Sequence, residues 1–213
     1  MTGVVPRGPL SVSILVFPGV EELDMVGFLE VLAVANRVVG KRWFATSLVG
    51  TSKGPIVLSG GLKVVPDCTI AHPGRHDMIF VPGGGAGRGR DSGRGGGVDA
   101  ASKDERVLRL LRSAEKRGAL VWSVCTGALI LGSAGLLKGR RATTHHAFIE
   151  RLRSYGARPV RARTVTDGRI TTGGGISSSI DVGLLLVGLS LGTKAVRGVE
   201  ERMEYYPPRR GLA

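Results

Sequence analysis

The segment Ala119-Leu-Val-Trp-Ser-Val-Cys-Thr-Gly-Ala-Leu-Ile-Leu131 joins two structural patterns. Residues 119–124 form a short apolar run, which predicts a buried strand. A helix of small and apolar residues is predicted to start at Thr126. Cys125 lies at the junction, so we expect its thiol to stand at the carboxyl edge of a sheet, in the strand–turn–helix arrangement of a nucleophile elbow. Gly127 lets such a helix approach the strand closely.

The same alternation continues on both sides of this segment. Strands are predicted at residues 12–17, 43–49 and 78–81, and helices at residues 23–34, 103–117 and 177–191. Asp167-Gly168, between two further strand patterns, predicts the two-residue turn of a hairpin. Alternating strand and helix periods favour an α/β fold, with a mostly parallel sheet and helices on both faces.

Length and composition suit one compact domain. The chain has 213 residues, of which 42% are hydrophobic and 22% charged. We predict a flexible N-terminus at residues 1–10 and a single domain at residues 11–213. No apolar run reaches the ~20 residues of a membrane span, and no secretory signal is recognisable. Two cysteines do not form a disulfide framework, so the expected setting is the reducing cytoplasm, with no membrane partner.

The charge balance is strongly basic. Lys and Arg number 30 against 17 Asp and Glu, which gives a net charge of +13. Aromatic residues make up only 5% of the chain, and the arginines are spread over several segments. This pattern favours a solvated basic surface over a nucleic-acid site, so no nucleic-acid partner is expected.

Residues 83–97 are unusually rich in glycine. Nine of these fifteen residues are Gly, and three are Arg88, Arg90 and Arg94. Glycine at this density predicts a mobile loop, either a lid or a plain surface loop. The glycine spacing does not fit the dinucleotide-binding fingerprint.

Cys125 itself has two interpretations. At a helix N-terminus its thiolate would be stabilised, which favours a reactive cysteine. Alternatively it is a small buried hydrophobic residue, like most free cysteines, and this is the favoured interpretation of Cys68. The neighbouring His145 and His146 diverge on any regular element, so no metal site is expected there.

Residues 123–145 resemble the nucleophile segment of the ThiJ/PfpI superfamily, and most of all its isonitrile hydratase branch. The similarity extends in order over nearly the whole chain, through Phe17-Pro18-Gly19 with Leu23-Asp24, Val81-Pro82-Gly83-Gly84, Thr171-Thr-Gly-Gly-Gly-Ile176 and Glu204-Tyr205. The resemblance implies a flavodoxin-like sandwich that forms a homodimer. It also implies a cysteine that acts on a small molecule without a metal or organic cofactor.

The resemblance implies a role for each residue that matches a functional position of the superfamily. Cys125 matches the nucleophile, and Asp24 matches the acidic residue that hydrogen-bonds near it. Thr126 takes the position after the nucleophile, where other branches often carry His, so a cysteine–histidine dyad is disfavoured. Its backbone N–H is expected to take part in catalysis by holding charge that develops on the substrate. Gly84 and Gly85 match the loop whose backbone N–H groups point at the substrate.

Further expectations concern the shape of the pocket, the loop behind it and the identity of the acid. His146 stands where relatives generally have Trp, so we expect it to bind substrate and to change the pocket's shape. His145 is expected to cap or orient the loop behind the site. Glu21 or Glu22 could replace Asp24 as the acid.

The expected reaction is hydration of an isonitrile to an N-substituted formamide. Cys125 would form a thioimidate, and Asp24 would supply a proton, which requires burial to raise its pKa. Glyoxal hydration, or another thiol-dependent step on a carbonyl or imine, is the alternative. A ligand-sensing domain is less favoured, because the chain ends at Ala213 with no room for a DNA-binding domain.

Overall fold

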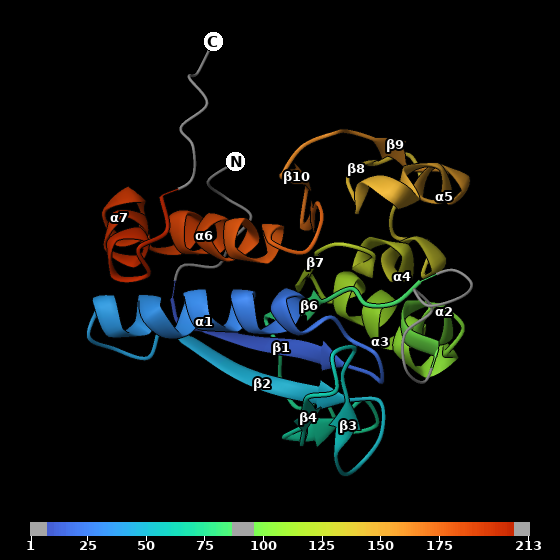
Figure 1. The fold of residues 1–213 in the computed structure, drawn as a ribbon, viewed down its shortest axis with the longest axis horizontal. Coiled ribbons are helices and arrows are strands. Elements are labelled where there is room, and N and C mark those ends of the chain that lie inside the picture. Colours follow the sequence, from blue (N-terminus) through green and yellow to red (C-terminus); the bar gives the residue numbers. More distant parts are fainter. Residues whose placement is uncertain (1–7, 87–95, 207–213) are drawn as a thin grey trace.

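A sheet of seven strands forms the centre of the molecule (Figure 1). The computed structural model describes residues 8–86 and 96–206. The strand order is β10-β11-β7-β6-β1-β2-β5, and every neighbouring pair is parallel except β10 with β11. The strands are β1 Leu10–Val16, β2 Phe44–Gly50, β5 Cys68–Thr69, β6 Met78–Val81, β7 Leu120–Ser123, β10 Thr164–Asp167 and β11 Ile170–Gly173.

Helices cover both faces of this sheet. They are α1 Glu22–Val38, α2 Gly97–Ala101, α3 Glu105–Lys116, α4 Gly127–Ser133, α5 Ile149–Ser154, α6 Ser178–Leu191 and α7 Thr193–Arg202. The connections through α1 (β1 to β2) and α3 (β6 to β7) run in opposite directions along the strand order. Because such connections are right-handed, these helices lie on opposite faces. The α6 and α7 helices pack with α1, and α4 packs beside α3. The structure therefore confirms the predicted flavodoxin-like α/β sandwich.

The predicted elements are present, with ends that differ by a few residues. The hairpin turn is shifted by one position, because Asp167 pairs with Ile170 and the turn is formed by residues 168–169. Helices α2, α5 and α7 were not predicted from the sequence. Nor were two small sheets, formed by β3 Ile56–Val57 with β4 Lys63–Val64 and by β8 Arg141–Ala142 with β9 Arg158–Pro159.

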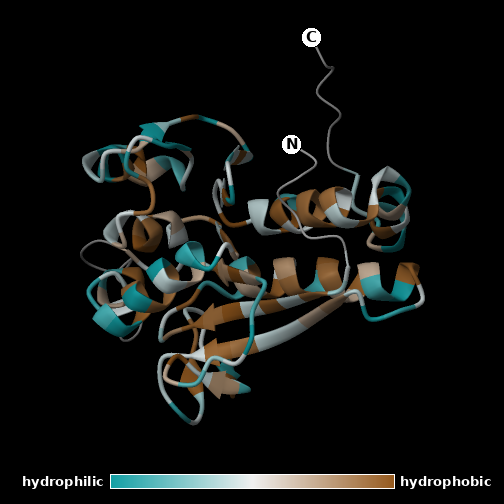
Figure 2. Ribbon diagram, turned by 180° about the vertical axis from the view of Figure 1, so that it is seen from behind, coloured by the Kyte–Doolittle hydropathy of each residue, from teal (hydrophilic) through white to brown (hydrophobic). Residues whose placement is uncertain are grey.

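The core lies along the central strands and helix α6, which are largely hydrophobic in Figure 2. All four residues of β6 and of β7 are buried, as expected for parallel strands covered on both faces. Phe28 of α1 stacks on Phe80 of β6 with 3.8 Å between ring centroids. This contact fixes α1 directly over the strand that precedes the Gly-rich segment.

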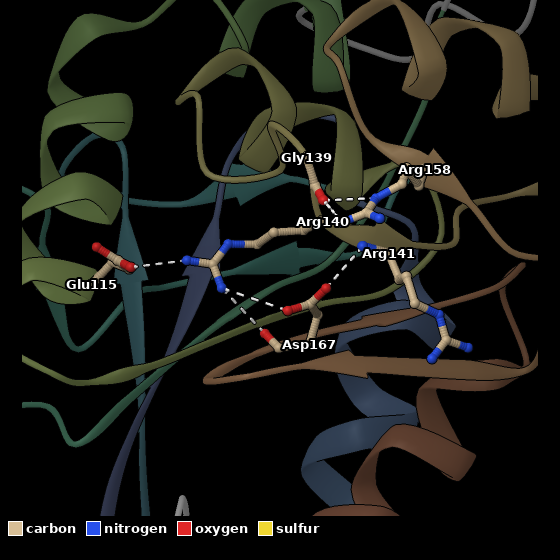
Figure 3. A network of polar contacts seen from close by, with 6 residues as sticks. All are labelled: Glu115, Gly139, Arg140, Arg141, Arg158 and Asp167. Carbon is tan, nitrogen blue, oxygen red and sulfur yellow. Dashed lines mark hydrogen bonds and ion pairs between the residues drawn. The ribbon is translucent and has the colours of Figure 1, made fainter.

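A polar network ties β8 and β9 to the main sheet (Figure 3). The Arg140 guanidinium bridges Glu115 of α3, at 3.4 Å, and Asp167 of β10, at 3.8 Å. The Arg141 backbone N–H donates to the Asp167 carboxylate at 2.9 Å, whereas the Arg141 guanidinium points away from the network. The network therefore holds the segment that leads into residues 143–146.

Parts of two predicted flexible segments lie outside the described residues. These are residues 1–7 of the N-terminus and residues 87–95 of the Gly-rich segment. Leu10, assigned by the sequence to the flexible N-terminus, is a buried residue of β1. None of the helices in residues 8–86 and 96–206 has the length and apolar character needed to span a membrane.

Gly127 is required where α4 meets the end of β6. A Cβ at this position would lie 2.3 Å from the Val81 carbonyl oxygen and 2.8 Å from that of Pro82. Both contacts are with backbone, which cannot move aside as a side chain could. We therefore expect Gly127→Ala to lower the free energy of unfolding by about 3 kcal/mol in urea titrations.

Gly188→Ala is the matched control, because its new Cβ would meet only a side-chain atom of Val196, at 3.3 Å. We expect it to remain within about 1 kcal/mol of wild type, since alanine also favours the helix. Equal stability of the two variants would contradict the close approach.

Candidate active site

The site forms where β1, β6 and β7 end side by side. The connections after β1 and β6 leave in opposite directions, so a crevice opens at the carboxyl edge between these strands. The loop after β1 leads to Asp24, the loop after β6 carries Gly83 and Gly84, and β7 leads to Cys125. The topology thus brings together residues that are far apart in the sequence.

Cys125 has the backbone of a nucleophile elbow. Its φ is +54°, in the left-handed region that non-glycine residues rarely occupy. Its N–H donates to the Gly174 carbonyl at 2.7 Å, and its carbonyl accepts a hydrogen bond from the Thr144 hydroxyl at 2.8 Å. These partners hold the strained residue in place. The predicted strand–turn–helix arrangement is confirmed.

Asp24 lies beneath the thiol. Its side chain is fully buried, and Oδ2 accepts a hydrogen bond from the Gly83 N–H at 2.8 Å. The Cys125 thiol and the Asp24 carboxyl group influence each other's pKa, so they lie close together, and Oδ1 of Asp24 has no hydrogen-bond partner among the described residues. The structure therefore pairs the two residues that the sequence analysis named as acid and nucleophile.

Burial changes the acidity of both partners. Burial raises the pKa of Asp24 to about 8, with a further contribution from the charge of Glu21, while the hydrogen bond from Gly83 and the neighbouring Cys125 thiol oppose the rise. Burial also raises the pKa of the Cys125 thiol, and the negative charge of Asp24 adds to this effect. The N–H and hydroxyl of Thr126 act in the opposite direction.

The expected direction for the Cys125 pKa was wrong. The sequence suggested that a helix N-terminus would stabilise the thiolate, but α4 has only seven residues and the thiol is nearly inaccessible. Loss of hydration and the neighbouring carboxylate therefore outweigh the backbone N–H groups. A thiolate forms most readily when the Cys125 proton moves to Asp24, because this leaves one negative charge in the pair.

Thr126 joins the elbow to the loop after β6. Its hydroxyl donates to the Gly84 carbonyl at 2.8 Å and accepts from the Gly84 N–H at 3.0 Å. The Gly84 N–H is therefore engaged inside the protein and is not free to contact a substrate as the sequence analysis expected. The Gly85 N–H donates, over 3.4 Å, to Gly19. Both glycines nevertheless line the cavity described next.

A cavity of about 370 Å³ opens above the thiol, which we call the active-site cavity. It is lined by Glu21, Ser59, Gly84, Gly85, Ala86, Cys125, Thr126, His145, Ala147, Phe148 and Ile176. Asp24 is not part of this wall, because it is covered completely. A molecule in the cavity would meet the thiol directly, whereas Asp24 would act from below.

Glu21 and Glu22 separate into different roles. Glu21 lines the active-site cavity, and burial, together with the charge of Glu22, raises its pKa. Glu22 instead accepts a hydrogen bond from the Gly60 N–H at 2.7 Å, which ties α1 to the β3–β4 loop. Of the two alternatives for the acid, only Glu21 therefore faces the cavity.

The structure places His145, and not His146, on the wall of the active-site cavity. His145 lines the active-site cavity, and its Nδ1 accepts a hydrogen bond from the Ala147 N–H at 3.3 Å, as its expected capping role requires. Burial lowers the pKa of His145, which favours a neutral ring at neutral pH. His146 lies on the wall of a different cavity. It does not shape the space above Cys125 in this structure.

Phe148 and Ile176 complete the apolar part of the wall, and the sequence analysis did not single them out. Phe148 ends a short 3-10 turn, whose geometry brings it beside His145. Ile176 closes the block Thr171–Ile176 that carries part of the resemblance, and this was the available signal. No group of three or more His, Cys, Asp or Glu in the described ranges is placed to hold a metal ion.

Proteins with similar sequences include an enzyme and transcriptional regulators. Residues 10–188 match the DJ-1/PfpI family. Isonitrile hydratase of Pseudomonas putida is 38% identical over 198 residues, which cover 93% of this chain and 79% of the relative. The transcriptional regulator CdhR of Pseudomonas aeruginosa is 31% identical, and the match covers 88% of this chain but 53% of the regulator.

Solved structures agree with this relationship. A THiJ/PfpI family protein from Pseudomonas syringae has a TM-score of 0.78 at 30% identity, over 99% of this chain and 81% of that one. DJ-1beta of Drosophila melanogaster has a TM-score of 0.79 at 22% identity, over 93% and 99%, and shows the shared fold alone. On sequence and fold together, the chain belongs to the DJ-1/PfpI family.

Proposed function

We propose that this protein is an isonitrile hydratase-like enzyme, which adds water to R–NC and releases R–NH–CHO. The observation that carries the proposal is the buried pair of Asp24 and Cys125 beneath a small cavity. The similarity to the Pseudomonas putida isonitrile hydratase supports it. Membership of the DJ-1/PfpI family favours an enzyme that uses its elbow cysteine. Isonitrile hydration is our more specific assignment.

In the first half of the reaction, the thiol adds across the isonitrile carbon. The Cys125 proton passes to Asp24 and from there to the terminal carbon, and the sulfur forms a bond to that same carbon. The product is the thioimidate R–N=CH–S–Cys125. Asp24 is therefore ionised before it takes the thiol proton and neutral when it gives that proton to carbon, and its raised pKa makes it a stronger base for the first of these transfers.

In the second half, water adds to the thioimidate carbon. One proton of the water passes to the nitrogen, the carbon–sulfur bond breaks, and Glu21 or His145 on the cavity wall transfers the remaining hydroxyl proton to the sulfur. Formamide and the free thiol result. Glu21 and His145 lie on the cavity wall, where either side chain can take a proton from the attacking water. Asp24 is too deeply covered to meet that water.

The cavity also allows an alternative substrate. Glyoxal hydration, or another thiol-dependent step on a carbonyl or imine, would use the same cysteine and the same small polar cavity. A ligand-sensing role has weaker support, because the CdhR regulator is less similar to this chain, at 31% identity, than the isonitrile hydratase, at 38%.

One assay separates these functions. The purified protein is incubated with a small isonitrile and, in parallel, with methylglyoxal, and the products are followed by mass spectrometry. We expect formamide from the isonitrile and no enzymatic hydroxyacid from methylglyoxal. Hydroxyacid without formamide would replace our assignment with the alternative, and neither product would favour ligand sensing.

We also propose a cytoplasmic homodimer. Several large apolar side chains on and beside α1 and α6 are exposed in the single chain, namely Leu23, Val26, Ile176 and Leu189. A second copy packed against these helices would cover them.

A further inference from the structure

A second cavity, of about 420 Å³, lies behind the nucleophile loop. Its wall includes Thr144, His146, Arg161, Arg163, Gly174 and Ser178, and we call it the arginine cavity. The active-site cavity is lined by the adjoining residues His145 and Ile176. The two cavities therefore lie beside the same two segments of chain. The proposed reaction uses only the active-site cavity.

A buried hydroxyl in the arginine cavity lacks a partner. Ser178 is only 1% exposed, and its Oγ makes no hydrogen bond within the described part of the chain. An unsatisfied buried hydroxyl costs free energy, so a native protein usually gives it a partner. Gly174 leaves space before it, because a Cβ there would lie 3.2 Å from the Ser178 Oγ and 3.3 Å from the Ala162 carbonyl.

The charges around the cavity are mainly positive. Arg161 is exposed, and its guanidinium has no hydrogen bond or ion pair to any residue that the structure describes. Arg163 is oriented by Asp181, with 2.9 Å between Nε and Oδ2, and by the Ser177 hydroxyl. Asp181 also accepts a hydrogen bond from Tyr205. One carboxylate therefore offsets one of two arginines, and a positive charge remains.

Helix α6 adds to this field. It begins at Ser178 and has fourteen residues, so its positive dipole end lies at the cavity. The hydroxyl of Ser178, the guanidinium of Arg161 and the imidazole of His146 can all donate hydrogen bonds. Donors combined with net positive charge suit an anion rather than a cation.

We propose that the arginine cavity binds a small carboxylate or phosphate group, held by Arg161 and by the hydroxyl of Ser178. The site lies next to the nucleophile's own backbone. Thr144 donates to the Cys125 carbonyl, and the Gly174 carbonyl accepts from the Cys125 N–H. An anion here therefore contacts the wall that holds the elbow, yet it does not occupy the space above the thiol. The inference is independent of the substrate proposed above.

Calorimetric titration with inorganic phosphate and, separately, acetate tests this site at constant low ionic strength. We expect wild type to bind one equivalent of at least one of the two ions, and the tighter ion identifies the group. Arg161→Gln should weaken binding about 10-fold or more, since it removes a charged hydrogen-bond donor. Ser178→Ala should weaken it a few-fold, by roughly the contribution of one neutral hydrogen bond.

Arg141→Gln is the matched control for charge. Arg141 is also an exposed arginine, its guanidinium points away from the polar network in Figure 3, and it is not part of the cavity wall. We expect its binding constant to match wild type. The proposal is overturned if wild type shows no saturable binding of either ion, or if Arg141→Gln and Arg161→Gln weaken binding equally.

A melting experiment gives a second readout. Without added anion, Ser178→Ala should unfold at or above the wild-type temperature, because it removes the unsatisfied hydroxyl. The ion that binds should raise the melting temperature of wild type but not that of Arg161→Gln. A marked loss of stability in anion-free Ser178→Ala would show that the hydroxyl already serves the fold, and would contradict the assignment.

Discussion

Replacing Cys125 by alanine is expected to lower isonitrile turnover by about 10⁴-fold or more, to the rate of the reaction without enzyme. The reaction needs a carbon–sulfur bond, and no other thiol faces the active-site cavity among the described residues. The rate of formamide release measures the effect. Alanine is smaller than cysteine and keeps the hydrogen bonds of the backbone to Thr144 and Gly174, so the fold should be retained.

Cys68→Ala is the matched control. Cys68 lies in β5 at the edge of the sheet and is only partly buried, so its removal should leave turnover unchanged. A mass increase equal to that of the isonitrile should appear in rapidly quenched wild type and in Cys68→Ala, but not in Cys125→Ala. Turnover that survives in Cys125→Ala would eliminate covalent catalysis by this residue.

Asp24→Asn is expected to reduce turnover by ~10²–10⁴-fold, the range typical of lost acid–base catalysis. Asparagine keeps an oxygen that can accept from the Gly83 N–H, but it cannot take the Cys125 proton or deliver one to carbon. Glu22→Gln, which alters a carboxylate held away from the cavity, should retain most of the activity. If Asp24→Asn remains active while Glu21→Gln does not, the acid is Glu21.

The pH dependence of turnover should carry the signature of Asp24. The productive form of the pair holds one proton, because the sulfur must be able to become a thiolate beside a neutral acid. Below the Asp24 pKa of about 8, both groups are protonated. We therefore expect kcat/KM of wild type to rise as the pH passes through about 8, and this step should vanish in Asp24→Asn. A wild-type rate that is already constant from pH 6 would contradict the assignment.

The free energy of unfolding should also depend on the ionisation of Asp24, but it should fall with rising pH where turnover rises. The folded-state pKa of Asp24 lies above its ordinary value of 3.8, so the folded protein binds more protons between these two values. The contribution of Asp24 to the free energy of unfolding is fully present below pH ~4 and is lost as the pH rises through about 8. In urea titrations at several pH values, Asp24→Asn should lack this fall in the free energy of unfolding with rising pH.

Local patterns were sufficient to predict the scaffold and the elbow, whereas the role of Asp24 came from the resemblance to the ThiJ/PfpI superfamily. The apolar run before Cys125 and the small residues after it predicted the elbow, and Asp24 matched an acidic position of that superfamily. Parallel strands that end at one edge then explain why these two residues meet. The Gly127 contact with Val81 also agrees with the expectation that a small residue is needed there.

What could not be predicted depends on burial and on the direction of individual side chains. The pKa of Cys125 is raised by burial of the thiol and by the charge of Asp24, and no local pattern reports either. His145 and His146 are neighbours at the start of a 3-10 turn, so a small rotation of the backbone decides which one faces the cavity. Gly84 matched a substrate-binding position, but its N–H is taken by Thr126 through a long-range contact.

The bond between the Cys125 N–H and the Gly174 carbonyl has a consequence for synthesis of the protein. The chain emerges from the ribosome with its N-terminus first, so β7 and its cysteine appear well before β11 and Gly174. Until β11 joins the sheet, nothing from the later segment can hold the elbow in its strained conformation. A nascent chain that has already produced the cysteine therefore lacks a competent thiol, and catalytic capability is acquired only when synthesis has passed residue 174.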